Sequence, residues 1–95
     1  MSAEELCKSH GIPICYFEGD VIERDGFYNP LFNAIAINSK LEGIHKDKVI
    51  YHEFGHKEHT ASYYKFNKEK AELQADRCMI HHLVKEEFQN LIDAI

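Results

Sequence analysis

Residues 52–56, with the sequence His-Glu-Phe-Gly-His, constrain this chain more than any other stretch because they fit the pattern H-E-x-x-H. On an α-helix, residues four apart differ by only about 40° around the axis, so His52 and His56 are expected on one face. Two imidazoles on one face can bind a single metal ion, as they do in zinc-dependent hydrolases. Glu53 follows His52 directly, and we predict it as the general base that takes a proton from the attacking water.

The histidine pair needs a third ligand, because a catalytic zinc site uses three protein ligands and keeps one position open. The segment 70–76 is typical of a helix and carries Glu72 and Asp76 four residues apart, on one face. We therefore predict that Glu72 binds the zinc ion. Asp76 is predicted to accept the free N–H of a ligand histidine and so to fix the tautomer of that histidine.

Together these two segments resemble the gluzincin arrangement, and the span from about residue 27 to 83 resembles the ImmA/IrrE type of phage and bacterial zinc peptidase. The Ala-Ile-Ala-Ile-Asn stretch at residues 34–38 corresponds to the extended segment that precedes the motif in that family. The chain departs from the family at residues 79–84, which replace a Leu-Met-Pro segment, and we expect no fused DNA-binding or sensor domain.

The resemblance implies a zinc-dependent endopeptidase whose protein substrate is a helix-turn-helix transcriptional repressor encoded nearby. Cleavage of the repressor would switch on phage, mobile-element or stress genes. The alternative is a zinc-containing, non-catalytic interaction module that binds a repressor or a toxin–antitoxin partner. A fourth protein ligand from His59, His81 or His82 would close the metal site and favour this alternative. Without such a ligand, these histidines, with His10 and His45, are expected at the surface.

Two further features bear on how a substrate would be held. Tyr63 and Tyr64 follow the motif closely and are candidates for stabilising the oxyanion of a tetrahedral intermediate, although aromatic residues in such a place also serve as packing. The strand expected at residues 34–37 is the candidate sheet edge on which an extended substrate would lie antiparallel.

Length and charge narrow the class of protein. A chain of 95 residues is expected to form one domain, residues 1–95, with a small core, so that zinc contributes to folding as well as to chemistry. Its net charge is −5 and it has only two arginines, which argues against direct nucleic-acid binding. The sequence leaves the oligomeric state open.

Cysteine usage and the N-terminus point to the cytoplasm. Cys7, Cys15 and Cys78 are odd in number and form no C-x-x-C pair, so we expect buried thiols rather than disulfides or a cysteine metal site. The N-terminus lacks the pattern of a signal peptide, and no stretch has the length of a membrane-spanning helix. We therefore expect a cytoplasmic protein with no membrane partner.

The first half of the chain predicts one short helix and a small sheet. Ser2 is expected to cap a helix that ends near His10, and residues 14–17 form a first strand. Residues 21–24 are ambiguous. A second β-prone run at residues 31–37, preceded by turn signals, completes a hairpin or meander.

The second half predicts helices. The motif helix is expected to begin at about Asp47, with the Asp47 carboxylate as its N-cap, and residues 61–66 are expected to be a connection. Asn67 would cap a last long helix. We predict an α+β fold in which a small antiparallel or mixed sheet packs on the motif helix and on a second, ligand-bearing helix.

Overall fold

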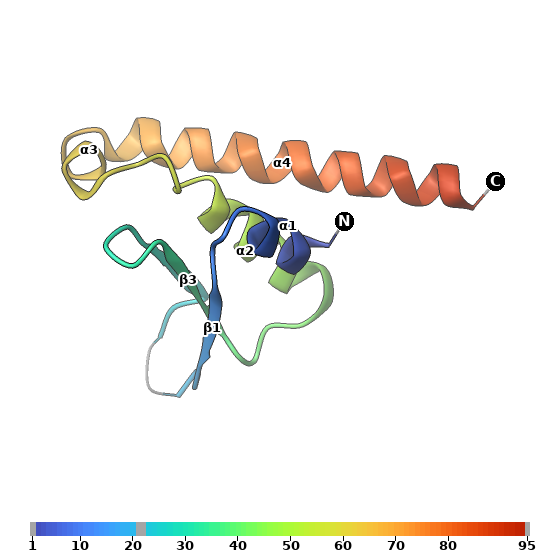
Figure 1. Cartoon of the computed structure of the whole chain (residues 1–95), viewed down its shortest axis with the longest axis horizontal. Coiled ribbons are helices and arrows are strands. Elements are labelled where there is room, and N and C mark those ends of the chain that lie inside the picture. Colours follow the sequence, from blue (N-terminus) through green and yellow to red (C-terminus); the bar gives the residue numbers. More distant parts are fainter. Residues whose placement is uncertain (1, 21–22, 95) are drawn as a thin grey trace.

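The chain folds as a small sheet covered by helices in the computed structural model, which describes residues 2–20 and 23–94. Figure 1 shows α4 along one side of the molecule, with α1 and α2 between it and the sheet. This arrangement confirms the predicted α+β class. The elements in chain order are α1 (Ala3–Ser9), β1 (Ile14–Phe17), β2 (Gly26–Asn29), β3 (Ala34–Asn38), α2 (Gly43–Phe54), α3 (Ala61–Phe66) and α4 (Lys68–Asp93).

The sheet is mixed, with the strand order β1-β3-β2. β1 pairs parallel with β3, and β2 pairs antiparallel with β3, so that Ile35 lies between Ile14 and Tyr28. The two predicted β-prone runs correspond to β1 and β3, which pair parallel, so they do not form a hairpin with each other; the hairpin is formed by β3 with β2, a strand that was not predicted. The prediction that residues 34–37 form a sheet edge is wrong, because β3 has a neighbour on each side and the edges are β1 and β2.

The second β-prone run is shorter than predicted, because its first residues form the hairpin turn. The Asn29 side chain accepts hydrogen bonds from the backbone N–H groups of Leu31 and Phe32, and Asn33 has a left-handed φ of 48°. Leu31 and Phe32 are therefore exposed in the turn, and the strand begins at Ala34. In the ambiguous segment 21–24, residues 21 and 22 lie outside the described residues.

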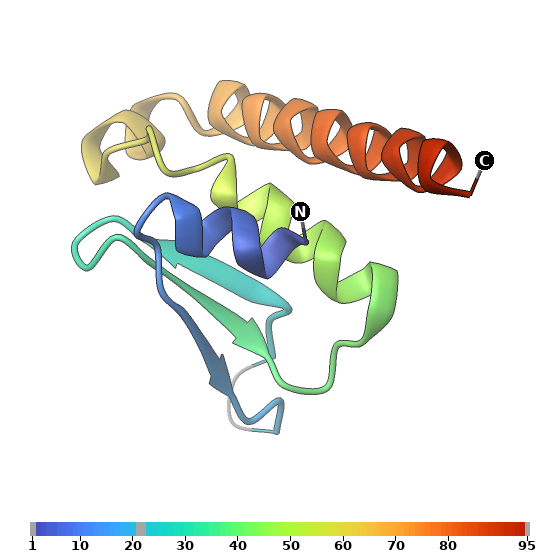
Figure 2. The same cartoon turned by 45° about the vertical axis from the view of Figure 1, so that its right-hand side comes forward.

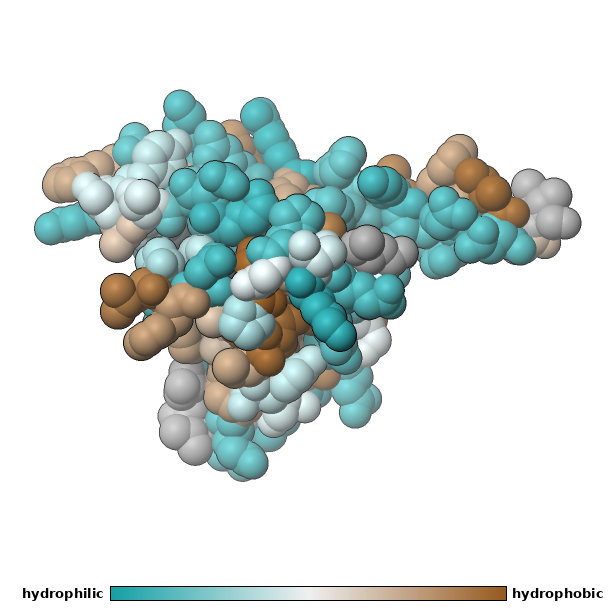
Figure 3. All heavy atoms as spheres, viewed as in Figure 1, coloured by the Kyte–Doolittle hydropathy of each residue, from teal (hydrophilic) through white to brown (hydrophobic). Residues whose placement is uncertain are grey.

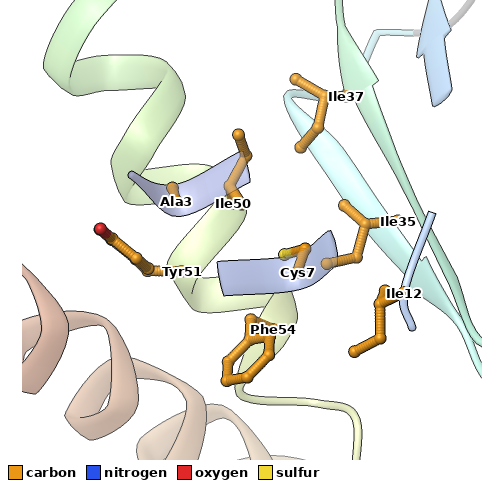
Figure 4. Close-up of a cluster of buried hydrophobic side chains, with 8 residues drawn as sticks. All are labelled: Ala3, Cys7, Ile12, Ile35, Ile37, Ile50, Tyr51 and Phe54. Atoms are coloured by element: carbon orange, nitrogen blue, oxygen red, sulfur yellow. The ribbon is translucent and has the colours of Figure 1, made fainter. Parts of the chain in front are cut away.

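The hydrophobic core lies between α1, the sheet and α2 (Figure 4). The Ser2 hydroxyl accepts a hydrogen bond from the Glu5 N–H, and α1 ends at Ser9 with His10 at the C-cap position, close to the predicted end. Alternate residues of β3 point into the core, as expected for a strand with one buried face. The buried cluster consists of Ala3, Cys7, Ile12, Ile35, Ile37, Ile50, Tyr51 and Phe54.

Helix α2 differs from the prediction at both ends. It begins at Gly43, and Glu42 occupies the N-cap position without a side-chain hydrogen bond, so the proposed Asp47 cap is wrong. It ends at Phe54, which places His56 in the turn that follows rather than in the helix. The turn keeps helical curvature, because the His56 N–H donates to the Glu53 carbonyl at 3.0 Å.

Gly55 allows α2 and α4 to approach each other closely. A Cβ atom at Gly55 would lie 2.7 Å from the Cα of Ala75 and 3.0 Å from the Cβ of Cys78. Ala71 and Ala75 on the facing side of α4 are fully buried. Small residues on both sides of this contact therefore set the distance between the two helices.

We expect Gly55→Ala to destabilise the protein by about 1–3 kcal/mol, because the contact with the Ala75 backbone leaves no room for a methyl group. The φ of Gly55 is −62°, so the backbone there does not itself require glycine. At such a position, exchanging glycine for alanine otherwise gains about 0.4–1 kcal/mol. The sign of the change in the urea unfolding midpoint therefore tests the close contact, and a midpoint at or above that of the wild type would contradict it.

The connection before α4 is more ordered than predicted. Residues 61–66, expected as a connection, form the short helix α3, and the Thr60 hydroxyl caps it by accepting from the Tyr63 N–H. Asn67 occupies the predicted N-cap position of α4, but its side chain makes no cap hydrogen bond. Its Nδ2 atom instead donates to the carbonyl oxygen of Tyr63.

The two ends of α4 have different environments. The N-terminal half packs on α2 through Ala71 and Ala75, and contact with α2 continues as far as Glu86, which accepts a hydrogen bond from the Tyr51 hydroxyl. The tip of α4 extends past the other elements (Figure 2). Phe88 and Leu91 on the C-terminal half are 62% and 60% exposed, and Figure 3 shows hydrophobic side chains near its tip. These apolar side chains, with Ile92 in the next turn, are therefore not covered by other described residues.

The described residues also show the environment of the cysteines and the character of the helices. Cys7 is buried, Cys78 is partly buried and Cys15 is exposed, so the expectation of buried thiols is wrong for Cys15, and all three thiols are free. In residues 2–20 and 23–94, no helix is both long enough and apolar enough to span a membrane.

Candidate metal centre

The packing of α2 on α4 brings together the three residues predicted as ligands. His52 comes from α2, His56 from the turn after it and Glu72 from α4, and one ligand atom of each lies within 4.8 Å of the others. The Glu72 carboxylate oxygens lie 3.0 Å from His52 Nε2 and 3.3 Å from His56 Nε2, and the two Nε2 atoms are 3.3 Å apart. Among the described residues, this group could hold a metal ion.

Glu53 lies beside this group and is not part of it. Its Oε1 atom accepts a hydrogen bond of 2.9 Å from the backbone N–H of Tyr28 on β2, and its Oε2 atom is 3.9 Å from His52 Nε2. Burial raises the pKa of Glu53 to about 7, although the neighbouring His52 and the Tyr28 N–H oppose this shift. A carboxylate with a raised pKa is a stronger base, which suits proton transfer.

Asp76 is placed as predicted, with its Oδ1 atom 2.9 Å from His52 Nδ1. When Nδ1 carries the proton of a neutral His52, it donates to Asp76, and Nε2 is left with a free lone pair. That lone pair is on the nitrogen nearest Glu72 and His56. The carboxylate therefore favours the tautomer of His52 that can bind a metal.

Electrostatics favour, for the other two residues of this group, the protonation states that can bind metal. Burial lowers the pKa of His56, which favours neutral imidazole. Partial burial raises the pKa of Glu72, but the hydrogen bond from Tyr64 and the charges of His56 and His52 outweigh it and leave the pKa below its ordinary value. Metal ligands must be deprotonated, and these shifts favour that state.

The two tyrosines predicted as oxyanion stabilisers differ in position. The Tyr64 hydroxyl donates to Glu72 Oε1 at 2.8 Å, and this hydrogen bond raises the pKa of Tyr64. Tyr64 therefore remains a hydrogen-bond donor at the ligand cluster. Tyr63 stacks on His59, with ring centroids 5.1 Å apart and planes 10° apart, and does not line the adjoining cavity.

His59 is the residue that the sequence interpretation placed wrongly. It was expected at the surface, but it is only 8% exposed and its Nδ1 atom lies 3.0 Å from Nδ1 of His56. Its Nε2 atom lies 2.7 Å from Gln74 Oε1 on α4. The only signal in the sequence was the three-residue spacing from His56. His82 is also partly buried, stacked on Tyr51, whereas His10, His45 and His81 are exposed as expected.

A cavity of about 490 Å³ opens beside the cluster. One wall carries the groups of the cluster, and the facing wall comes from β2 and the segments around it, with Phe27, Tyr28 and Pro30. Arg24 also lines the cavity, with its guanidinium 5.5 Å from the centre of the Phe27 ring. The sheet edge at the cavity is therefore β2 rather than β3.

An α+β domain in which two histidines and two glutamates converge on one cavity has the arrangement of a metallopeptidase. Comparison with protein families gives the more particular assignment. The model of the Peptidase_M78 family, described as IrrE N-terminal-like domain, matches residues 7–92, and the chain belongs to this family.

This match confirms the ImmA/IrrE resemblance and extends it well beyond residues 27–83. It includes all the residues of the cluster. No curated protein and no solved structure matches the chain.

Proposed function

We propose that this protein is a zinc-dependent endopeptidase in which His52, His56 and Glu72 bind the metal and Glu53 is the general base. One observation supports this proposal above the others. The metal-binding group in the described part of the chain has three members and adjoins an open cavity, with Glu53 at its side. Three protein ligands with a free position are typical of catalytic zinc, whereas structural zinc has four.

The donor set fits zinc. Two imidazole nitrogens and one carboxylate oxygen form a ligand set found in zinc peptidases, and harder ions such as Mg²⁺ favour all-oxygen sites. His59, the nearest candidate for a fourth ligand, contacts the Nδ1 side of His56, away from the Nε2 atom that faces the cluster. This placement favours the enzyme over the closed, non-catalytic interaction module.

The chemistry divides between the metal and the protein. Zinc bound at this site would supply a Lewis acid that activates water and polarises the peptide carbonyl. Glu53 takes the proton of the attacking water and returns it to the leaving amine. The Tyr28 N–H holds the Glu53 carboxylate in place, and the Tyr64 hydroxyl is near enough to the ligand cluster to donate to the oxyanion.

The substrate would lie along β2. The Tyr28 N–H points away from β3, toward Glu53, so the unpaired edge of the sheet faces the general base. An extended peptide can add to such an edge through backbone hydrogen bonds. Phe27 and Pro30 in the cavity favour an apolar side chain close to the bond that is cut.

The family resemblance supports a helix-turn-helix transcriptional repressor as the protein substrate, and the cytoplasm, where repressors act, as the location. The test is incubation of the purified product of the adjacent gene with the zinc-loaded protein, followed by mass spectrometry of the fragments. Cleavage that a chelator abolishes and zinc restores is expected. Tight binding of an intact repressor, with no cleavage, would instead establish the interaction module.

Metal content gives a test that needs no substrate. The purified protein is expected to hold about one zinc ion per chain after refolding with zinc, because the cluster provides one set of three donors. Elemental analysis measures this ratio, and His52→Ala should lower it while the exposed His45→Ala should not. No bound zinc in the refolded wild type would refute the proposal.

A further inference from the structure

The feature that this function does not yet explain is the chain of contacts from His56 through His59 to Gln74. Both histidines are buried, at 6% and 8% exposure, and their Nδ1 atoms lie 3.0 Å apart. Gln74 Oε1 lies 2.7 Å from Nε2 of His59. No buried side-chain nitrogen or oxygen lacks a hydrogen-bond partner in the described part of the chain, so these contacts are part of a satisfied network.

Hydrogen-bond chemistry fixes the direction of this chain. The amide oxygen of Gln74 can only accept, so Nε2 of His59 must carry a proton. A neutral His59 then has no proton on Nδ1, and that nitrogen accepts from Nδ1–H of His56. A neutral His56 with its proton on Nδ1 has a free lone pair on Nε2, the atom that lies 3.3 Å from Glu72 Oε1.

We propose that His59 and Gln74 are positioning residues for the metal site, and that they hold His56 with its proton on Nδ1 and its Nε2 free to bind the metal. The inference rests on the proposed zinc site. The opposite direction, with His59 donating to His56, would place the His56 proton on Nε2 and block coordination. A bound metal and the two hydrogen bonds therefore favour the same tautomer.

The place of His56 in the fold explains why this support is needed. His52 is held by α2 itself, and its Nδ1 contacts Asp76 directly. His56 follows the end of α2, so the helix does not fix its side chain. Stacking of His59 on Tyr63 orients the connecting ring, and Gln74 ties it to α4.

Helix α4 therefore supports the site in three ways, over a span of five residues. Glu72 is the ligand, Asp76 supports His52 directly, and Gln74 supports His56 through His59. A metal site held from one rigid helix keeps its geometry better than one held from loops.

Gln74 gives the cleanest test because its side chain is exposed and its variants should fold. Gln74→Met keeps the length but removes the acceptor, and we expect zinc affinity to fall by about 10-fold or more. Gln74→Glu offers only acceptor oxygens, and its zinc affinity should equal or exceed that of the wild type. Affinity is measured by competition with a chelator, and the unfolding midpoint of each metal-free variant confirms an intact fold.

His59→Phe tests the other member of the pair. Phenylalanine can keep the stacking on Tyr63 but cannot accept from His56, so zinc affinity should fall by about 10–100-fold. The visible spectrum of the Co²⁺-substituted protein should also change, because it reports the geometry around the metal. His45→Phe makes the same exchange at an exposed position and should leave affinity and spectrum unchanged.

The outcomes separate this inference from the proposed function. A wild type that binds no zinc refutes the zinc site itself. A wild type that binds zinc, with Gln74→Met and His59→Phe equal to it, overturns the positioning role alone. Weaker binding by Gln74→Glu than by Gln74→Met also overturns it, since Gln74 would then be acting as a donor.

Discussion

Glu53→Gln is expected to slow peptide hydrolysis by about 10²–10⁴-fold while leaving metal content and fold unchanged. The amide keeps the size of the side chain, and its oxygen can still accept the Tyr28 N–H. It cannot take a proton from water. Cleavage rate and zinc content, measured on the same preparation, together test whether Glu53 acts in catalysis without binding the metal.

Glu58→Gln is the matched control, because Glu58 is five residues away and its side chain is 81% exposed. It should cleave at the wild-type rate. A Glu53→Gln protein that is as active as the wild type would refute the proposed general base. Loss of zinc along with activity would instead make Glu53 a metal ligand.

Glu72→Ala should weaken zinc binding more than Asp76→Ala does. Loss of a partner that only orients a ligand typically costs about 10–100-fold in affinity, and loss of a ligand itself costs more. Glu72 contacts both histidines at the cluster, whereas Asp76 contacts only Nδ1 of His52. Chelator competition measures both affinities.

Glu69→Ala, in the first turn of the same helix, controls for loss of a carboxylate from α4. Its zinc affinity should match that of the wild type. If Glu72→Ala also binds zinc as tightly as the wild type, the third ligand is another residue. If Asp76→Ala has the larger effect, the roles of the two carboxylates are reversed.

Local sequence patterns anticipated the parts of the fold that depend on neighbouring residues. The Ser2 cap, the end of α1 and the strand at residues 14–17 appear where they were predicted. The start of β3 was predicted less well. The hydrogen bonds to the Asn29 side chain and the left-handed φ of Asn33 extend the hairpin turn to residue 33, so β3 begins later than the β-prone run suggested. Residue type alone does not show that the apolar residues Leu31 and Phe32 lie exposed in the turn and not in the strand.

The placement of His59 shows which part of the site the sequence could not predict. Its two partners lie on different segments, and only the packing of α4 brings Gln74 within 2.7 Å of it. The spacing between His56 and Glu72 did predict a shared cluster, because both segments carry a motif whose members share one face. No such motif marks His59.

The sequence by itself determined the candidate ligands, the candidate general base and the α+β class, because these follow from spacing within single elements and from the order of elements along the chain. Tertiary structure alone decided that β3 is central, that β2 faces the cavity and that His59 contacts His56. It also decided how near α2 lies to α4, through the missing side chain of Gly55. Periodicity fixes which residues share a face, but the distance between two faces depends on how their side chains pack.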